Sequence, residues 1–128
     1  MSSELMSLCW VLALQLVMWV PYILNTITVR GLMGAVGYPD DPKPLSDWAD
    51  RLKKAHYNAV ENLVVFAALV LTANAAGITS ETTVLVCEIY VWARVGHLLL
   101  YTFAVPYGRT LAFAVGWICQ VALLLEIL

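Results

Sequence analysis

Charged side chains are scarce in this sequence of 128 residues. Asp, Glu, Lys and Arg make up 12% of it, and 62% of the residues are hydrophobic. A typical soluble domain is about 25% charged and roughly 45 to 50% apolar. The scarcity of charge therefore excludes an ordinary water-soluble globule, and the mean hydropathy of +0.81 indicates a membrane protein.

Long basic runs and paired cysteines are also missing. A nucleic-acid-binding face needs clustered positive charge, and the formal net charge here is -2, so we expect no nucleic-acid partner. Cys9, Cys87 and Cys119 form no Cys-x-x-Cys pair, which argues against a redox motif or a structural zinc site. We expect no metal ion and interpret all three as small buried hydrophobic side chains.

The N-terminus lacks the features of a cleaved signal peptide. Residues 1–4 contain no Lys or Arg, and the apolar run continues past Pro21 without a small-residue cleavage site. We therefore expect this run to remain as a first transmembrane helix, in which Pro21 is a tolerated kink because neighbouring helices satisfy the freed carbonyl.

Four apolar segments have about the 20 residues that a membrane-spanning helix requires. The predicted spans are residues 5–29, 59–76, 82–105 and 110–128. A polar helical start at Asp47 leads into the second span, so this helix is predicted to project beyond the membrane from a connection of residues 30–58. Short connections elsewhere favour antiparallel neighbours. The prediction is one domain, residues 1–128, an all-α integral membrane four-helix up-down bundle.

Basic residues divide unevenly between the connections. Those in or beside the first and third connections are Arg30, Lys43, Arg51, Lys53, Lys54 and Arg109, and the second connection has none. By the positive-inside rule, the first and third connections face the cytoplasm and both termini lie outside. The short loops favour a bacterial inner membrane.

Ionisable side chains inside spans are functional candidates, because each costs about 2.5 to 3.5 kcal/mol to insert. At about 100° per residue, two polar stripes result. They comprise Tyr90, Arg94, His97 and Tyr101 on the third span and Arg51, Lys54, Asn58, Glu61 and Asn62 on the second. We expect the stripes to face each other, with Glu61 and Arg94 as a buried pair. His56 points elsewhere and is interpreted as structural, and Glu88 has only a subunit contact as a predicted role.

Positive charge is expected to gather at the cytoplasmic end of the bundle. The converging side chains are Arg30, Arg51, Lys54, Arg94 and Arg109. They carry more charge than Glu61 offsets, so a cleft there suits a small anionic ligand.

Two motifs resemble the signature of the MAPEG superfamily, the membrane-associated proteins in eicosanoid and glutathione metabolism. The first is Arg51-Leu-Lys-Lys-Ala-His-Tyr-Asn-Ala-Val-Glu61-Asn, and the second is Arg94-Val-Gly-His97, followed by Tyr101 and by Arg109-Thr110. Either motif alone is weak, whereas both in order on four spans are fairly specific. The resemblance covers nearly the whole chain.

The resemblance implies a homotrimer that binds glutathione between subunits and acts as a transferase, peroxidase or eicosanoid-forming synthase. A lipophilic second substrate would arrive through the membrane lipid. Positions that match the family's glutathione site are Arg51, Asn58, Glu61, His97 and Tyr101, and Arg30 resembles a basic residue at the end of the first helix. Arg109 resembles the arginine that activates the thiol, and Thr110 stands where some members have a serine near the sulfur.

The hypothesis is therefore a membrane glutathione transferase or peroxidase. In it Arg109 stabilises the thiolate, basic side chains including Lys54 hold the carboxylates, and Glu61 receives the amine. Structural alternatives stay open for three of the residues: helix contact for His97, packing for Tyr101 and helix capping for Thr110.

Two departures from the family pattern leave other functions open. Tyr57 stands where prostaglandin-forming members carry an Arg, and the spacing from Tyr101 to Arg109 is about one residue shorter. One alternative is thus a non-catalytic membrane assembly partner. Another is a small four-span transporter, whose key carboxylate typically lies in the first helix, where this chain has none after Glu4.

Overall fold

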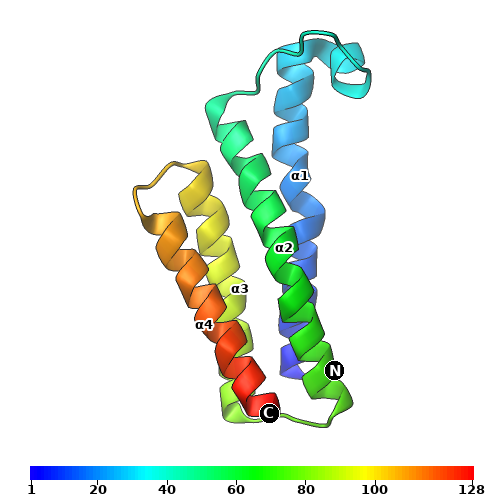
Figure 1. The fold of residues 1–128 in the computed structure, drawn as a ribbon. Helices are drawn as coiled ribbons and strands as arrows, with labels where there is room; N and C mark the ends of the chain where they lie inside the picture. The colour runs from blue at the N-terminus through cyan, green and yellow to red at the C-terminus, as the bar shows by residue number, and fades with distance from the viewer.

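A computed structural model describes residues 1–128 as four long helices joined by connections. The helices are α1 (Ser3–Val36), α2 (Asp47–Ala75), α3 (Glu81–Thr102) and α4 (Gly108–Ile127). All four are long and apolar enough to cross a membrane, which confirms the predicted all-α membrane bundle. Neighbours in sequence run antiparallel, and both termini lie at one end of the bundle (Figure 1).

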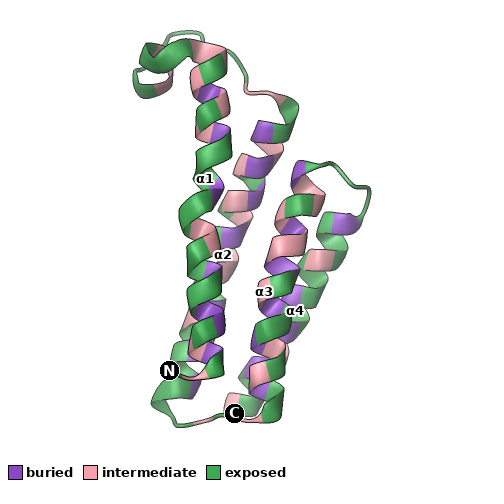
Figure 2. Ribbon diagram, turned by 180° about the vertical axis from the view of Figure 1, so that it is seen from behind, coloured by how far each residue is buried: buried purple, intermediate pink, exposed green.

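The bundle is held together by buried faces along the helix axes. Helix α3 packs on α4 and also contacts α1 and α2, and α1 packs along α2. Buried residues lie on the faces that the helices turn toward one another (Figure 2). Toward the chain termini Phe66 stacks on Tyr90 with 3.8 Å between ring centroids. Toward the other end the alanines Ala49, Ala55 and Ala59 of α2 are buried, and such small side chains let membrane helices approach closely.

Helix α1 continues past its predicted end at Val29. Gly31 adopts φ 73° and ψ 165°, which breaks the helix without ending it, and residues 32–36 form a last helical segment that turns aside (Figure 1). A positive φ is open to glycine at little cost. The first span was predicted to end at residue 29, and the connection therefore begins later than predicted, after the helical residues 32–36.

The connection between α3 and α4 begins earlier than predicted, at Phe103. Ala104 and Tyr107 adopt positive φ values of 55° and 64°, so the helical path stops after Thr102. Tyr107 is the N-cap residue of α4. Thr110 therefore lies within the first turn of α4, and the capping role considered for it was wrong.

A buried carboxylate ties the start of α1 to the start of α3. Glu4 is 4% exposed, and its Oε1 accepts hydrogen bonds from Thr79 Oγ1 at 2.7 Å and Thr83 Oγ1 at 2.6 Å. Thr83 also completes a capping box with Ser80. No local sequence pattern predicts this contact, because its partners lie far apart along the chain.

Two of the three cysteines occupy the predicted environment. Cys87 and Cys119 are buried, whereas Cys9 is exposed. The prediction of burial was therefore wrong for Cys9, because it lies on a face of α1 that no other helix of this chain covers.

Candidate functional site

Arg94 is a buried cation near the middle of the bundle. Its Nη2 donates a hydrogen bond to Asn58 Oδ1 at 2.8 Å and lies 3.4 Å from His97 Nδ1. The side chain is 3% exposed, and its Nε is buried without a hydrogen-bond partner. Arg94 thus joins α3 to α2 through a neutral amide and has no carboxylate beside it.

The predicted buried pair of Glu61 and Arg94 was wrong. Glu61 is exposed, and the ion pair of this chain joins Lys54 Nζ to Asp50 Oδ2 at 3.0 Å. Glu61 follows Asn58 by three residues, which places it about 60° away around α2. Because Asn58 faces Arg94, this rotation turns the Glu61 carboxylate toward the outside of the bundle.

A row of amides extends the polar contacts from Arg94 into the core. Asn62 Nδ2 donates to Asn58 O at 2.8 Å, and Gln120 Nε2 of α4 donates to Asn62 O at 3.1 Å. Gln120 also lies 3.5 Å from the hydroxyl of Tyr90. Gln120 was not among the residues predicted from the sequence, although a single amide in an apolar span indicates a contact between helices.

Tyr101 and Arg109 continue the row toward the connection between α3 and α4. The ring of His97 meets that of Tyr101 edge-on, with 5.6 Å between centroids and 76° between planes. The Arg109 guanidinium lies over the ring of Tyr101, with its Cζ 4.4 Å from the ring centroid. Arg109 and Thr110 are exposed in the first turn of α4. This geometry leaves the guanidinium accessible while a ring holds its position.

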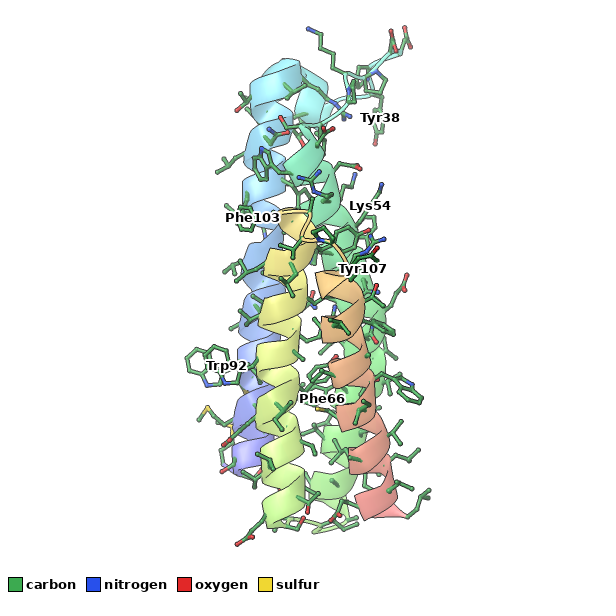
Figure 3. All side chains as sticks on the ribbon, turned by 90° about the vertical axis from the view of Figure 1, so that its left-hand side faces the viewer. Tyr38, Lys54, Phe66, Trp92, Phe103 and Tyr107 are labelled. Atoms are coloured by element: carbon green, nitrogen blue, oxygen red, sulfur yellow. The ribbon has the colours of Figure 1, made fainter.

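Arg51 reaches the same end of α3. Its Nε donates to the carbonyl oxygen of Thr102 at 3.0 Å. This carbonyl lies at the C-terminal end of α3, where the negative end of the helix dipole also stabilises a cation. Lys54 lies near the level of the connection between α3 and α4 (Figure 3), and its side chain is 62% exposed. Arg51, Lys54, Arg94 and Arg109 thus all lie toward this half of the bundle.

Arg30 lies apart from these residues. Its Nε donates to the carbonyl oxygen of Lys43 at 2.7 Å, while Asn25 hydrogen-bonds Ser46 at the level where α2 begins. Arg30 lies five residues beyond Asn25, and Arg51 lies five residues inside Ser46, so the two are separated by about 15 Å along the helices. The predicted convergence of basic side chains was therefore wrong for Arg30 within one chain.

His56 fills a structural position between α1 and α2. Its Nδ1 lies 2.9 Å from the hydroxyl of Tyr22, which is the kind of structural contact predicted for it. Its neighbour Tyr57 is 55% exposed, with Lys53 Nζ 5.8 Å from the ring centroid. Tyr57 therefore presents an exposed aromatic ring on α2, beside the ammonium group of Lys53.

These features define a class: a small multi-pass integral membrane protein with a polar row between its helices and exposed cations at one end. Comparison with known families matches residues 6–128 to the MAPEG family. The chain belongs to the MAPEG family.

The chain is similar to mammalian proteins called microsomal glutathione S-transferase 1. The protein from Bos taurus is 33% identical over 72 residues, which are 56% of this chain and 46% of the relative. The one from Homo sapiens is 32% identical over 72 residues, with the same coverage of 56% and 46%. The one from Rattus norvegicus is 35% identical over 69 residues, covering 53% and 44%. The match thus covers less than half the length of these relatives, and no solved structure gives a significant match.

Proposed function

We propose that this protein activates glutathione as a thiolate toward lipophilic electrophiles or hydroperoxides in the membrane. The observation that carries the proposal is the exposed Arg109 guanidinium, which the Tyr101 ring holds at 4.4 Å at the end of a row of polar contacts through Arg94. Family membership and the printed name of the relatives, glutathione S-transferase, support the same chemistry.

The charge of the site suits an anionic tripeptide. Glutathione carries two carboxylates, and the four cations Arg51, Lys54, Arg94 and Arg109 lie toward one half of the bundle, where the single ion pair engages Lys54 alone. A buried charge without a counter-ion is costly. Arg94 therefore favours an anion nearby, and its Nε, which has no partner in the chain, is a donor available for it.

Arg109 supplies a positive charge that would stabilise the thiolate of glutathione. A free thiol has a pKa of about 8.5, so at neutral pH it is mostly protonated, and only the thiolate is a strong nucleophile. A guanidinium about 4 Å from the sulfur gains on the order of 4 kcal/mol with the thiolate at an effective dielectric near 20. That corresponds to roughly three pK units before desolvation is subtracted. Half of this shift would bring the thiol pKa to about neutral pH, so that much of the glutathione would be thiolate. Thr110 follows Arg109 in α4, and its hydroxyl would donate a hydrogen bond to the sulfur.

The remaining site residues divide between three kinds of contact with glutathione. Arg51 and Lys54 would hold a carboxylate, Asn58, His97 and Tyr101 would position the peptide, and Glu61 would receive the amine. Glu61 is exposed on the outer face of α2, and Arg30 lies about 15 Å from Arg51 along the helices. One chain therefore does not gather the whole set, which supports a site shared between copies of the chain.

We accordingly propose a homotrimer with glutathione at the contacts between subunits. An unpaired carboxylate on the outside of a membrane-spanning helix is costly in lipid, so a neighbouring subunit or its ligand is the natural partner for Glu61. The first and third connections would face the cytoplasm, where glutathione is dissolved, in a bacterial inner membrane.

The experiment is glutathione conjugation with 1-chloro-2,4-dinitrobenzene by the purified protein. Removing one preorganised charge-stabilising donor typically lowers kcat about 100- to 1,000-fold, so we expect a loss of that order for Arg109→Ala. Arg109→Lys is the matched control, because it keeps a charge near the sulfur and should retain part of the rate. Full activity of Arg109→Ala would remove this residue from the chemistry.

A second candidate function is a MAPEG protein that assembles in the membrane without catalysis. Tyr57 favours it, since an exposed ring replaces the arginine of the prostaglandin-forming members and removes one carboxylate contact. Glutathione binding without turnover of any electrophile would support this alternative, whereas Tyr57→Arg should then strengthen glutathione binding.

A further inference from the structure

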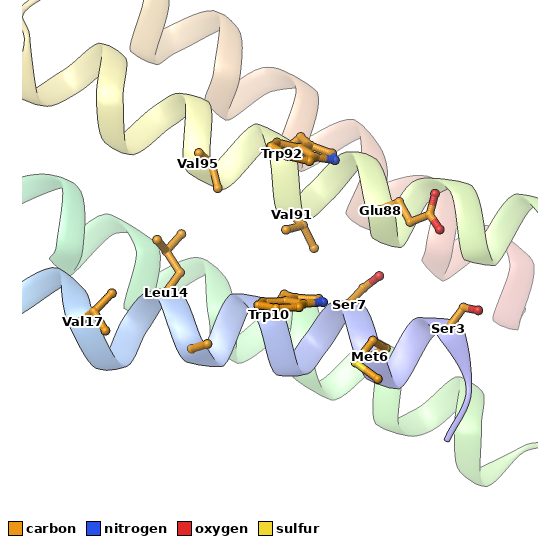
Figure 4. A pocket seen from close by; sticks show the side chains of 11 residues that line it. Ser3, Met6, Ser7, Trp10, Leu14, Val17, Glu88, Val91, Trp92 and Val95 are labelled. Atoms are coloured by element: carbon orange, nitrogen blue, oxygen red, sulfur yellow. The ribbon is translucent and has the colours of Figure 1, made fainter.

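A groove runs between α1 and α3 in the half of the bundle that carries the chain termini. It encloses about 710 Å³ and is lined mainly by hydrophobic side chains. Trp10 of α1 and Trp92 of α3 lie on its facing walls, with Ser7 and Glu88 beside them (Figure 4). We call it the α1–α3 groove. None of the residues proposed to bind glutathione lines it.

Helical spacing divides the α1–α3 groove into a polar end and an apolar end. Glu88 and Trp92 are one turn apart on α3, as Ser7 and Trp10 are on α1, so each pair points to the same side of its helix. Farther along, Leu14 of α1 and Val95 of α3 line the groove with aliphatic side chains. The groove therefore has the shape and polarity of a site for a molecule with one polar end.

The polar end carries a negative charge that no residue of the chain neutralises. Glu88 is exposed, and the ion pair of this chain lies elsewhere, between Lys54 and Asp50. No Lys or Arg lines the groove. A carboxylate on a membrane-spanning helix is costly unless it is paired, so the position of Glu88 favours a ligand with positive charge.

The indoles of Trp10 and Trp92 also favour a positively charged ligand. Trp10 is 63% exposed and Trp92 is 74% exposed, and their faces border the groove on opposite sides (Figure 4). The face of an indole attracts ammonium and quaternary ammonium groups more strongly than other aromatic rings do. Two such rings next to a carboxylate form a recognition site for an organic cation.

The geometry points to the α1–α3 groove as a binding site for a cationic amphiphile, a single-chain lipophilic amine or quaternary ammonium compound taken up from the membrane. Its ammonium group lies between Trp10 and Trp92 and pairs with Glu88. Its alkyl chain lies along Leu14 and Val95. A phospholipid does not fit the site as well, because its phosphate would meet Glu88 with no basic side chain to hold it.

Tryptophan fluorescence of the purified full-length protein in a neutral maltoside detergent tests the inference. The probe is dodecylpyridinium, a cationic amphiphile whose ring quenches indole emission. We expect saturable quenching that dodecyltrimethylammonium reverses and that dodecyl sulfate leaves unchanged. Glu88→Gln should weaken the binding at least fivefold, and Trp92→Leu should weaken it and reduce the quenched fraction.

The matched control is Glu81→Gln, which removes the same charge from the first turn of α3 outside the groove. It should bind the probe as the original protein does. Equal binding by Glu88→Gln, or equal weakening by Glu81→Gln, would overturn the inference, because the attraction would then be to net charge alone. Disulfide-linked dimers of Val95→Cys in a Cys9→Ser background would also overturn it, since a second copy of the chain would then occupy the groove.

Discussion

The guanidinium of Arg109 lies over the ring of Tyr101, with 4.4 Å between Cζ and the ring centroid. The first residue is at the start of α4 and the second is in the last turn of α3. The connection between these helices contains two residues with positive φ, which bring α4 back along α3. The ring thus fixes the position of the cation to which the proposed function assigns the activation of the thiol.

Replacing Tyr101 should separate the contribution of its ring face from that of its hydroxyl group. Tyr101→Phe keeps the face beneath Arg109 and should retain most of the glutathione conjugation rate. Tyr101→Leu removes an interaction of about 0.5 to 1 kcal/mol at an exposed site, so kcat should fall roughly two- to fivefold. Steady-state kinetics of the two variants measures this difference. If Phe and Leu lower the rate equally, the hydroxyl rather than the ring is the contributing group.

The contact between Asn58 and Arg94 should stabilise the fold. Asn58→Leu leaves the buried guanidinium without its acceptor, and hydrogen bonds to charged groups contribute about 1.5 to 3 kcal/mol. We expect the free energy of unfolding in detergent to fall by about that amount. The double variant Asn58→Leu/Arg94→Met should recover much of the loss, because it also removes the buried charge. Unchanged stability of Asn58→Leu would show that this contact has no net energetic value.

The carboxylate of Glu4 should stabilise the opposite end of the bundle. Glu4→Ala removes the acceptor of the hydroxyl hydrogen bonds from Thr79 and Thr83, so the free energy of unfolding should fall by about 2 kcal/mol. Ser3→Ala, at an exposed neighbour, is the control and should leave stability unchanged. Thermal unfolding of the two proteins gives the comparison. The rate of glutathione conjugation per folded molecule should stay the same, and a selective loss of that rate would contradict the location proposed for the site.

Gly108 should be intolerant of a side chain because α4 begins in contact with α3. A Cβ at Gly108 would lie 3.0 Å from Leu100 Cδ2 and 3.2 Å from its Cβ. Gly108→Ala should therefore shift the first turn of α4, and with it Arg109, and lower the conjugation rate. Gly96→Ala is the matched control, since nothing lies within 4 Å of a Cβ there, and it should leave the rate unchanged and raise stability by up to about 1 kcal/mol. Equal effects of the two substitutions would contradict this account.

Properties that depend on local sequence were predicted well. The four spans follow from hydropathy, and the polar stripe of α3 follows from its helical period, which brings Arg94, His97 and Tyr101 onto one face. The continuation of α1 beyond Gly31 was missed, because a glycine with positive φ is compatible with either a helix end or a break.

Properties that depend on how helices are rotated and aligned were predicted less well. The period of α2 places Asn58 and Glu61 in one polar arc, but it does not say which of them faces Arg94. The structure places Asn58 there, and Glu61 is exposed as a result. Burial of Glu4 likewise depends on α1 and α3 starting at the same level, which no local pattern encodes.

Calorimetry of glutathione binding to the detergent-purified protein, with the ultraviolet absorbance of the thiolate recorded in parallel, tests whether Arg109 activates glutathione. We expect the original protein to bind glutathione and produce a thiolate signal, and we expect Arg109→Ala to bind glutathione with the signal lost. Absence of binding at millimolar glutathione, or a thiolate signal that persists in Arg109→Ala, would contradict this proposal.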